Sequence, residues 1–200
     1  KHSFPTRRSS DLDDEQDVKS IQAVLNGERN AFTSIVSRYT KVLFSLSYHM
    51  TGNREEAEEA VQEIFILIFR KLHKYNQEKR FYTWMFTVAV NYLKTLVRKS
   101  NRFSPNPDLQ FDDSLQYELN TLQESSPEND LIRRESGKVL QSALNRLPLK
   151  YRSVFILREV EGISIKETAA ILRIPENTVK TLSRRGKDEL KKIIVSLEWN

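Results

Sequence analysis

The residues best suited to chemistry lie between Phe81 and Arg102, where aromatic side chains precede a run of lysines and arginines. Nucleobases of single strands stack on aromatic rings, and their phosphates pair with such cations. The segment therefore indicates a protein that grips or opens single-stranded nucleic acid. The competing interpretation is structural, because aromatic residues at helical spacing usually pack into a core.

Helices must position these residues, because apolar side chains recur at three-to-four spacing through the first hundred residues. Asn53 is a good N-cap, with Glu56 as its capping-box partner, and Asn26-Gly27 and Thr51-Gly52 are stop signals. Four helices with short turns predict a small all-α domain. They are expected from Val18 to Leu25, from Phe32 to Leu46, from Asn53 to about His73, and across Phe81 to Arg102.

The third of these helices has two unequal faces. Its core stripe is Ala57, Val61, Ile64, Phe65, Ile68 and Leu72, and beside or opposite it stand Glu59, Gln62, Glu63, Ile66 and Phe69. Acidic groups beside exposed apolar groups form either a docking surface for a basic protein helix or an ordinary solvated face. No histidine, serine constellation or glycine-rich phosphate loop accompanies the glutamates, so the sequence predicts no enzyme.

The last seventy residues have the order of a helix-turn-helix. A helix from Leu131 to Leu147 stops at Pro148, and another runs from about Lys150 to Val160. Ser164 and Glu167 form a capping box that opens a short helix. A turn then leads into a last helix that begins near Thr178.

Inward and outward positions alternate along that last helix. Val179, Leu182, Gly186 and Leu190 are expected to face inward, which leaves Lys180, Thr181, Arg184, Arg185 and Lys187 outward. Donors in the N-terminal half of such a helix enter the major groove of DNA. The alternative is a solvated basic face on an ordinary helical hairpin.

Charge divides the chain into two basic bodies around an acidic connector. Residues 103–130 carry seven acidic and no basic side chains, whereas residues 131–200 carry 15 basic and 8 acidic ones. Three of the six prolines also fall between 103 and 130, so we interpret this stretch as a flexible, partly disordered linker. The predicted fold is all-α, with helical domains at 13–102 and 131–200.

Composition excludes several classes of protein. The longest apolar run has six residues, Ile64 to Phe69, far short of the roughly 20 that a spanning helix needs. There is no apolar signal segment, and with no cysteine and three unclustered histidines we expect no metal site and no cofactor. A cytoplasmic location is compatible with this composition. Residues 1–12 read as a translated sequencing adapter, the alternative being a flexible basic arm that touches phosphates.

Five motifs, in order and spacing, resemble the extracytoplasmic-function (ECF) RNA polymerase sigma factors of bacteria. The resemblance covers Asp17 to about Ile194. It rests on AFTSIVSRY, GNREEAEEAVQEIFILIFRKL, FYTWMFTVAVNYLKTLVRK, LPLKYRSVFILREVEGISIKETAAIL and IPENTVK.

That resemblance implies a two-domain initiation subunit that joins core RNA polymerase and reads two promoter elements. Asn91 matches a position used near a flipped base of the minus-ten element, with phosphate contacts expected from Lys94, Arg98, Lys99 and Arg102. The minus-thirty-five element would meet Thr178, Lys180, Thr181, Arg184, Arg185 and Lys187. The polymerase partners would be the clamp coiled coil of the β′ subunit, at Glu59, Gln62, Glu63 and Ile66, and the β flap. The family also implies an anti-sigma factor and no small-molecule substrate.

The chain departs from the family pattern at four positions. Asn177 replaces a usual glycine, Ser183 a commonly apolar residue and Thr87 a commonly basic one, and Gly186 costs the last helix roughly 1 kcal/mol relative to alanine. These departures predict a recognition helix that frays. Two rival functions remain open: a stand-alone helix-turn-helix regulator that binds duplex operators as a dimer, and a sigma-like decoy that no longer reads promoters.

Overall fold

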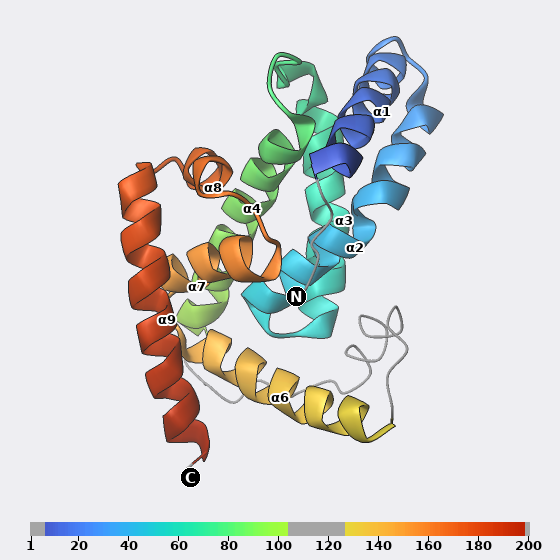
Figure 1. Cartoon of the computed structure of the whole chain (residues 1–200). Coiled ribbons are helices and arrows are strands. Elements are labelled where there is room, and N and C mark those ends of the chain that lie inside the picture. Colours follow the sequence, from blue (N-terminus) through green and yellow to red (C-terminus); the bar gives the residue numbers. More distant parts are fainter. Residues whose placement is uncertain (1–6, 104–126, 199–200) are drawn as a thin grey trace.

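The computed structural model describes residues 7–103 and 127–198, and every regular element in these two ranges is a helix (Figure 1). Side chains are described for 15–100 and 137–197. The first half comprises α1 (Arg7–Leu25), η1 (Arg29–Ala31), α2 (Phe32–Thr51), α3 (Arg54–Lys71), η2 (Leu72–Lys74) and α4 (Phe81–Phe103). The second comprises α6 (Pro127–Arg146), α7 (Leu149–Phe155), η3 (Ile156–Val160), α8 (Ile165–Leu172) and α9 (Glu176–Glu198). The predicted all-α class is confirmed, and most of the predicted linker lies outside the described residues.

Helix ends in the first half follow local chemistry. Gly52 ends α2 in the left-handed region, with φ of 78°. Asn53 then caps α3, because its side chain accepts a hydrogen bond of 3.0 Å from the Glu56 amide. The reciprocal half of the predicted capping box is wrong, since the Asn53 amide is directed to Thr51 Oγ1 at 3.4 Å.

The predicted capping box in the second half is complete. Ser164 Oγ accepts from the Glu167 amide, and the Glu167 carboxylate accepts from the Ser164 amide. This box begins α8 directly after the turn at Gly162, whose φ is 65°. The short helix, the turn at Arg173 and the long α9 give the predicted helix-turn-helix order.

Several predicted helix boundaries differ from the structure. α6 begins at Pro127, before the predicted start at Leu131 and inside the predicted linker. α1 begins at Arg7, so it includes part of the segment that we set aside as adapter and is longer than the helix predicted from Val18. The single helix predicted to reach Val160 changes to π-helical hydrogen bonding at Ile156. The spacing of apolar residues predicts helix for both α7 and η3, but it does not distinguish α-helical from π-helical hydrogen bonding over five residues.

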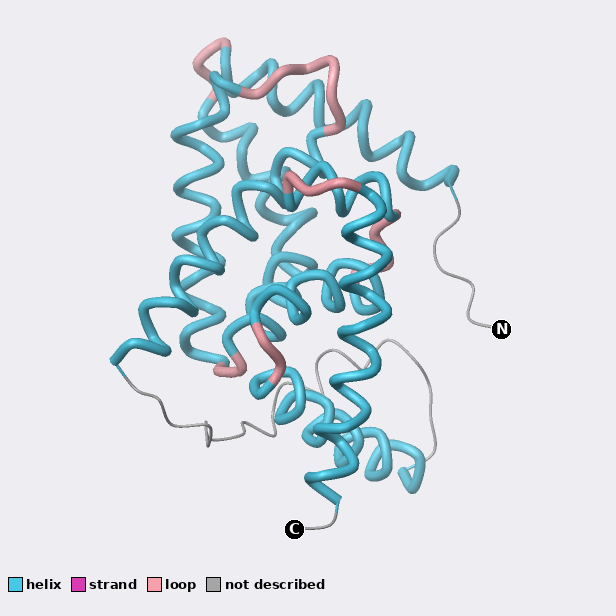
Figure 2. Tube along the Cα trace, turned by 90° about the vertical axis from the view of Figure 1, so that its left-hand side faces the viewer, coloured by secondary structure: helices cyan, strands magenta, loops and turns pink. Residues whose placement is uncertain are grey.

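The two halves share a core. Ile156, Leu157, Ile163 and Ile171, all at most 4% exposed, belong to the same apolar cluster as the centre of the first half. α8 packs on α4 and α6 on α2 (Figure 1), and the view turned by 90° shows the second half lying along the first (Figure 2). The two helical domains predicted from the sequence therefore pack against each other through this shared core.

Polar contacts cross this boundary, which we call the seam. Arg152 Nη1 donates to the carbonyl of Met50 at 3.0 Å, and Ser45 Oγ donates to Glu161 Oε1 at 2.7 Å. Two further contacts join His49 Nδ1 to Gln141 Oε1 at 2.8 Å and Arg80 to Glu167 at 2.9 Å. The seam is thus both apolar and hydrogen bonded.

Replacing Glu161 with glutamine is expected to stabilise the folded chain at pH 8 by about 1–3 kcal/mol and to change little near pH 4.5. Burial raises the pKa of Glu161 to about 7, despite the hydrogen bond from Ser45. Below the pKa of the unfolded state this carboxyl is neutral in both states. As the pH rises from there through about 7, the free energy of unfolding falls, because the unfolded chain ionises more readily than the folded one. Glutamine carries no charge, so the variant escapes that loss.

Thermal unfolding of both proteins between pH 4.5 and 8 measures this difference. Burial lowers the pKa of His49, which gives the opposite pH dependence, but His49 is common to parent and variant and cancels in the comparison. Glu28→Gln, at an exposed position, is the matched control. A variant no more stable than the parent at pH 8 would show that Glu161 is solvated.

Candidate nucleic-acid and polymerase interfaces

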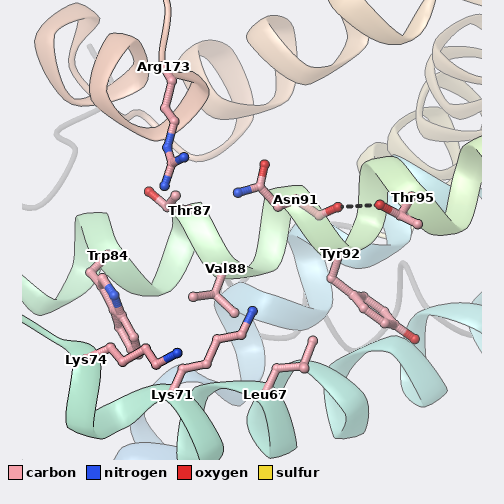
Figure 3. A pocket seen from close by; sticks show the side chains of 10 residues that line it. All are labelled: Leu67, Lys71, Lys74, Trp84, Thr87, Val88, Asn91, Tyr92, Thr95 and Arg173. Atoms are coloured by element: carbon pink, nitrogen blue, oxygen red, sulfur yellow. Dashed lines mark hydrogen bonds between the residues drawn. The ribbon is translucent and has the colours of Figure 1, made fainter.

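One exposed face of α4 opens onto a cavity of about 560 Å³. Residues of α4 form one wall because their spacing of three and four places them on one side of the helix. The lining consists of Leu67, Lys71 and Lys74 from α3 and η2, of Trp84, Thr87, Val88, Asn91, Tyr92 and Thr95 from α4, and of Arg173 (Figure 3). Aromatic, aliphatic and cationic groups thus surround a space large enough for a nucleotide.

Asn91 presents a free amide to this cavity. Its side chain is exposed and has no hydrogen-bond partner in the described part of the chain, whereas its backbone carbonyl accepts from Thr95 Oγ1 at 3.0 Å (Figure 3). A carboxamide offers both donors and an acceptor, which suits the edge of a nucleobase. The predicted position of Asn91 beside a pocket is therefore consistent with the geometry.

The aromatic residues of α4 divide between core and cavity. Phe86 is fully buried, as predicted. Trp84 and Tyr92, also predicted as core, are half-buried: they pack against the core and at the same time line the cavity. Both interpretations of the sequence therefore apply to these two rings, since each combines core packing with a place in the cavity wall.

The basic residues after Asn91 are not equally available. Arg98 and Lys99 are exposed, whereas Lys94 is half-buried and its pKa is lowered by burial and then by Arg98. The side chain of Arg102 lies outside the described residues. Asn91, Lys94 and Arg98 share one face of α4, so a strand entering the cavity would pass along these cations.

α9 has the inward and outward faces that the sequence predicts. Val179 and Leu190 are buried, while Lys180, Thr181, Arg184 and Arg185 are exposed. Thr178 is half-buried, and the Thr181 hydroxyl donates to the carbonyl of Asn177 at 2.9 Å. Lys187 is exposed as well, and its amine pairs with Glu159 at 2.8 Å.

Gly186 has a packing role that the sequence does not reveal. α9 runs unbroken from Glu176 to Glu198. Gly186 is buried, and a Cβ at this position would lie 3.3 Å from Tyr151 Cβ. Glycine thus allows α9 to lie close to α7.

Gly186→Leu is expected to lower the free energy of unfolding by about 1–3 kcal/mol, although leucine favours helix more than glycine does. The larger side chain must displace Tyr151. Thermal denaturation followed by circular dichroism measures the loss. Asp188→Leu, at an exposed position on the same helix, is the control, and equal melting temperatures for both variants would contradict the packing role.

The acidic face of α3 is exposed as predicted. Glu59, Gln62, Glu63 and Ile66 follow one another at helical spacing, and Ile66 and Phe69 are 42% and 39% exposed. The face lies near Tyr92 of the cavity wall, whose pKa is raised by burial and then by the carboxylates of Glu63 and Glu59. An apolar and acidic surface of this kind fits a basic helix.

Within 7–103 and 127–198, no helix is long and apolar enough to cross a membrane. The same residues hold no group of three or more histidine, aspartate or glutamate side chains placed to bind a metal ion.

The fold and the basic α9 define a DNA-binding helical protein with a helix-turn-helix. Residues 35–103 match the family Sigma-70 region 2, and residues 138–190 match Sigma-70, region 4. The chain is 32% identical to the ECF RNA polymerase sigma factor SigW of Bacillus subtilis, over 87% of this chain and 94% of that relative. It therefore belongs to the ECF RNA polymerase sigma factors, a non-catalytic family that serves promoter recognition.

Two solved structures have a similar fold. CnrH in complex with the cytosolic domain of CnrY gives a TM-score of 0.62 at 18% identity, over 92% of this chain and 97% of that one. The sigma factor RpoE of Bartonella quintana, in complex with the anti-sigma factor NepR, gives 0.61 at 18%, over 82% and 96%. These likenesses support the helical architecture.

The structure also identifies residues that sequence reasoning missed. Lys71, Lys74 and Arg173 line the cavity but were not among the predicted site residues. The basic cluster at the end of α3 was a visible signal for the two lysines. Arg173 gave no such signal, because only the packing of α8 on α4 brings it to the cavity.

Proposed function

We propose that this sigma factor opens promoters by holding an unpaired minus-ten base in the cavity beside Asn91. The observation that carries the proposal is the free amide of Asn91 in a cavity lined by Trp84 and Tyr92. A base that leaves the stack needs a pocket that provides both hydrogen bonds and apolar contact. Arg98, Lys99, Arg102 and the half-buried Lys94 would hold the adjoining phosphates.

The minus-thirty-five element would be read by α9. Lys180, Arg184 and Arg185 are exposed donors near the N-terminal half of a helix that follows a tight turn. Thr178 and Thr181 would add contacts at the start of the helix. The pairing of Lys187 with Glu159 favours a minor role for Lys187.

Core polymerase would bind the exposed face of α3 through its β′ clamp coiled coil, and the second half would contact the β flap. Charge supports this assignment, because the face combines Glu59 and Glu63 with the exposed Ile66. An anti-sigma factor is a further expected partner, as RpoE of Bartonella quintana has one. The site of action would be the cytoplasm, where the polymerase is found.

The test is transcription from a promoter library by bacterial core polymerase with and without the purified chain. We expect the chain to bind core and to produce transcripts that share two upstream elements. No binding to core would overturn the proposal. Binding to core without promoter-dependent transcripts would favour the decoy, and tight binding of duplex DNA by the chain alone would favour a stand-alone regulator.

A further inference from the structure

The cavity beside Asn91 carries more positive charge than an unpaired base requires. Lys71, Lys74 and Arg173 all line it, and no carboxylate does so in the described part of the chain. These three side chains are exposed, and none of them forms a hydrogen bond or an ion pair with another described residue. A nucleobase is neutral, and the phosphates of a DNA strand already have the basic residues that follow Asn91 on α4. The three cations are therefore unused by the proposed function.

Cations around one space favour an anion between them. Like charges repel one another, and a negative group held between them removes that repulsion. Lysine amines and arginine guanidinium groups both bind phosphate oxygens, and arginine can hold two oxygens at once. The cavity is thus suited to a ligand that brings phosphates of its own.

The fold fixes the origin of the third cation. Arg173 adopts the left-handed conformation, with φ of 55° and ψ of 48°, at the end of α8. Its backbone amide donates to the carbonyls of Ala169 and Ala170, which closes the last turn of the helix. Because α8 packs on α4, this turn is placed beside the cavity wall. The guanidinium therefore reaches the cavity from a well-defined backbone position.

The two ends of the cavity offer different chemistry. Arg173 points toward Thr87, and Lys74 lies next to Trp84 in the same view (Figure 3). Asn91 stands further along α4 and presents its free amide. From Thr87 to Asn91 the helix advances by about 6 Å, a length that a ribose bridges between a base and its phosphate. Phosphates at one end and a base at the other match the parts of a nucleotide.

Volume and charge indicate which nucleotide fits. The cavity of about 560 Å³ is of the size that holds small-molecule ligands and cofactors. A nucleoside diphosphate carries about three negative charges at neutral pH, since the second ionisation of a terminal phosphate has a pKa of about 6. That charge balances the three cations, whereas a monophosphate would leave part of theirs uncompensated.

We infer that the cavity binds a free nucleoside 5′-diphosphate, with its base beside Asn91 and its phosphates among Lys71, Lys74 and Arg173. The inference rests on the proposed function in one respect, because both place a nucleobase beside Asn91. It requires neither polymerase nor promoter. A bound nucleotide occupies the space of the minus-ten base, so the two ligands exclude each other.

The fluorescence of Trp84, which lines the cavity, measures this binding directly. The chain has one other tryptophan, so Trp199→Phe leaves Trp84 as the only tryptophan reporter. ADP, GDP, CDP and UDP are each titrated into this protein without polymerase or DNA. At least one of them should give a saturable change. Its monophosphate should bind about tenfold more weakly and its nucleoside at least 100-fold more weakly, because charge-assisted hydrogen bonds are lost.

Substitution of the cations separates phosphate contacts from general charge. Lys74→Gln and Arg173→Asn should each weaken diphosphate binding about tenfold, and asparagine tolerates the left-handed backbone at residue 173. Lys79→Gln is the matched control, because Lys79 is an exposed residue of the same connection that does not line the cavity. It should bind within twofold of the parent. Equal weakening by all three substitutions would overturn the inference, as would inorganic pyrophosphate binding as tightly as the diphosphate.

Single-stranded hexanucleotides of random sequence distinguish a free nucleotide from a strand. If they bind and no diphosphate does, the three cations serve the phosphates of DNA, and the inference is overturned while the proposed function stands. Absence of binding by any of these ligands also overturns the inference, and transcription with core polymerase then decides the proposed function separately. Diphosphate binding by a chain that fails to bind core would overturn the proposed function alone.

Discussion

Replacing Arg152 with methionine is expected to lower the free energy of unfolding by roughly 3–5 kcal/mol, because three backbone carbonyls lose a buried hydrogen-bond donor. Arg152 is 5% exposed, and burial lowers its pKa to about 10. No carboxylate pairs with it among the described residues. Instead its guanidinium donates to the backbone carbonyls of Met50, Asn145 and Leu147.

Methionine fills a similar volume but cannot donate, so three carbonyls lose their partner. A buried polar group left unpaired costs about 1–3 kcal/mol. Some of that cost is offset, because the buried cation and its unpaired Nε also disappear. Natural domains are stable by only about 5–15 kcal/mol, so the expected loss is a large part of the total free energy of unfolding.

Thermal unfolding followed by circular dichroism measures the effect, with an expected decrease in melting temperature of roughly 6–15 °C. Arg146→Met is the matched control, because Arg146 is exposed at the end of α6. The control is expected to stay within 0.5 kcal/mol of the parent. A decrease of less than 2 °C for Arg152→Met would mean that water replaces the guanidinium.

Local signals in the sequence predicted the elements and their exposed faces. The core stripe of α3, the cap at Asn53 and the capping box at Ser164 each depend on residues within one or two turns of each other. The exposure of Glu63 and Arg184 follows from the same periodicity. Such features are decided by the helix itself, so its sequence is enough to find them.

The seam could not be predicted, because periodicity shows which side chains are buried but not what covers them. Ile163 and Ile171 belong to the second half of the chain, yet they pack into the core of the first. Likewise, no local signal in the sequence marks Arg152 or Glu161 as buried. Their burial follows from a contact between residues a hundred positions apart, and the same contact brings Arg173 to the cavity.

Reversing charge on the docking face is expected to weaken binding to core polymerase roughly 100-fold, which corresponds to about 2.7 kcal/mol. Glu63→Lys makes this change at an exposed position of α3, so the fold should be unaffected. Glu28→Lys alters the net charge equally at an exposed position between α1 and η1 and should bind core like the parent. Fluorescence anisotropy of labelled chain titrated with core polymerase provides the measurement.

Asn91→Ala is expected to do the opposite of Glu63→Lys: it should change which bases are selected and leave binding to core polymerase intact. Loss of the amide should reduce discrimination between bases at one minus-ten position by roughly 10- to 100-fold, since one good base contact is worth about 1–3 kcal/mol. Affinity for core should stay within twofold, because Asn91 lies on α4 and outside the acidic face of α3. Promoter selection from a randomised library, with each variant assayed for core binding in parallel, separates the two roles. If Asn91→Ala lost core binding, or Glu63→Lys changed only the bases selected, the assignment of the cavity to DNA and of α3 to polymerase would have to be exchanged.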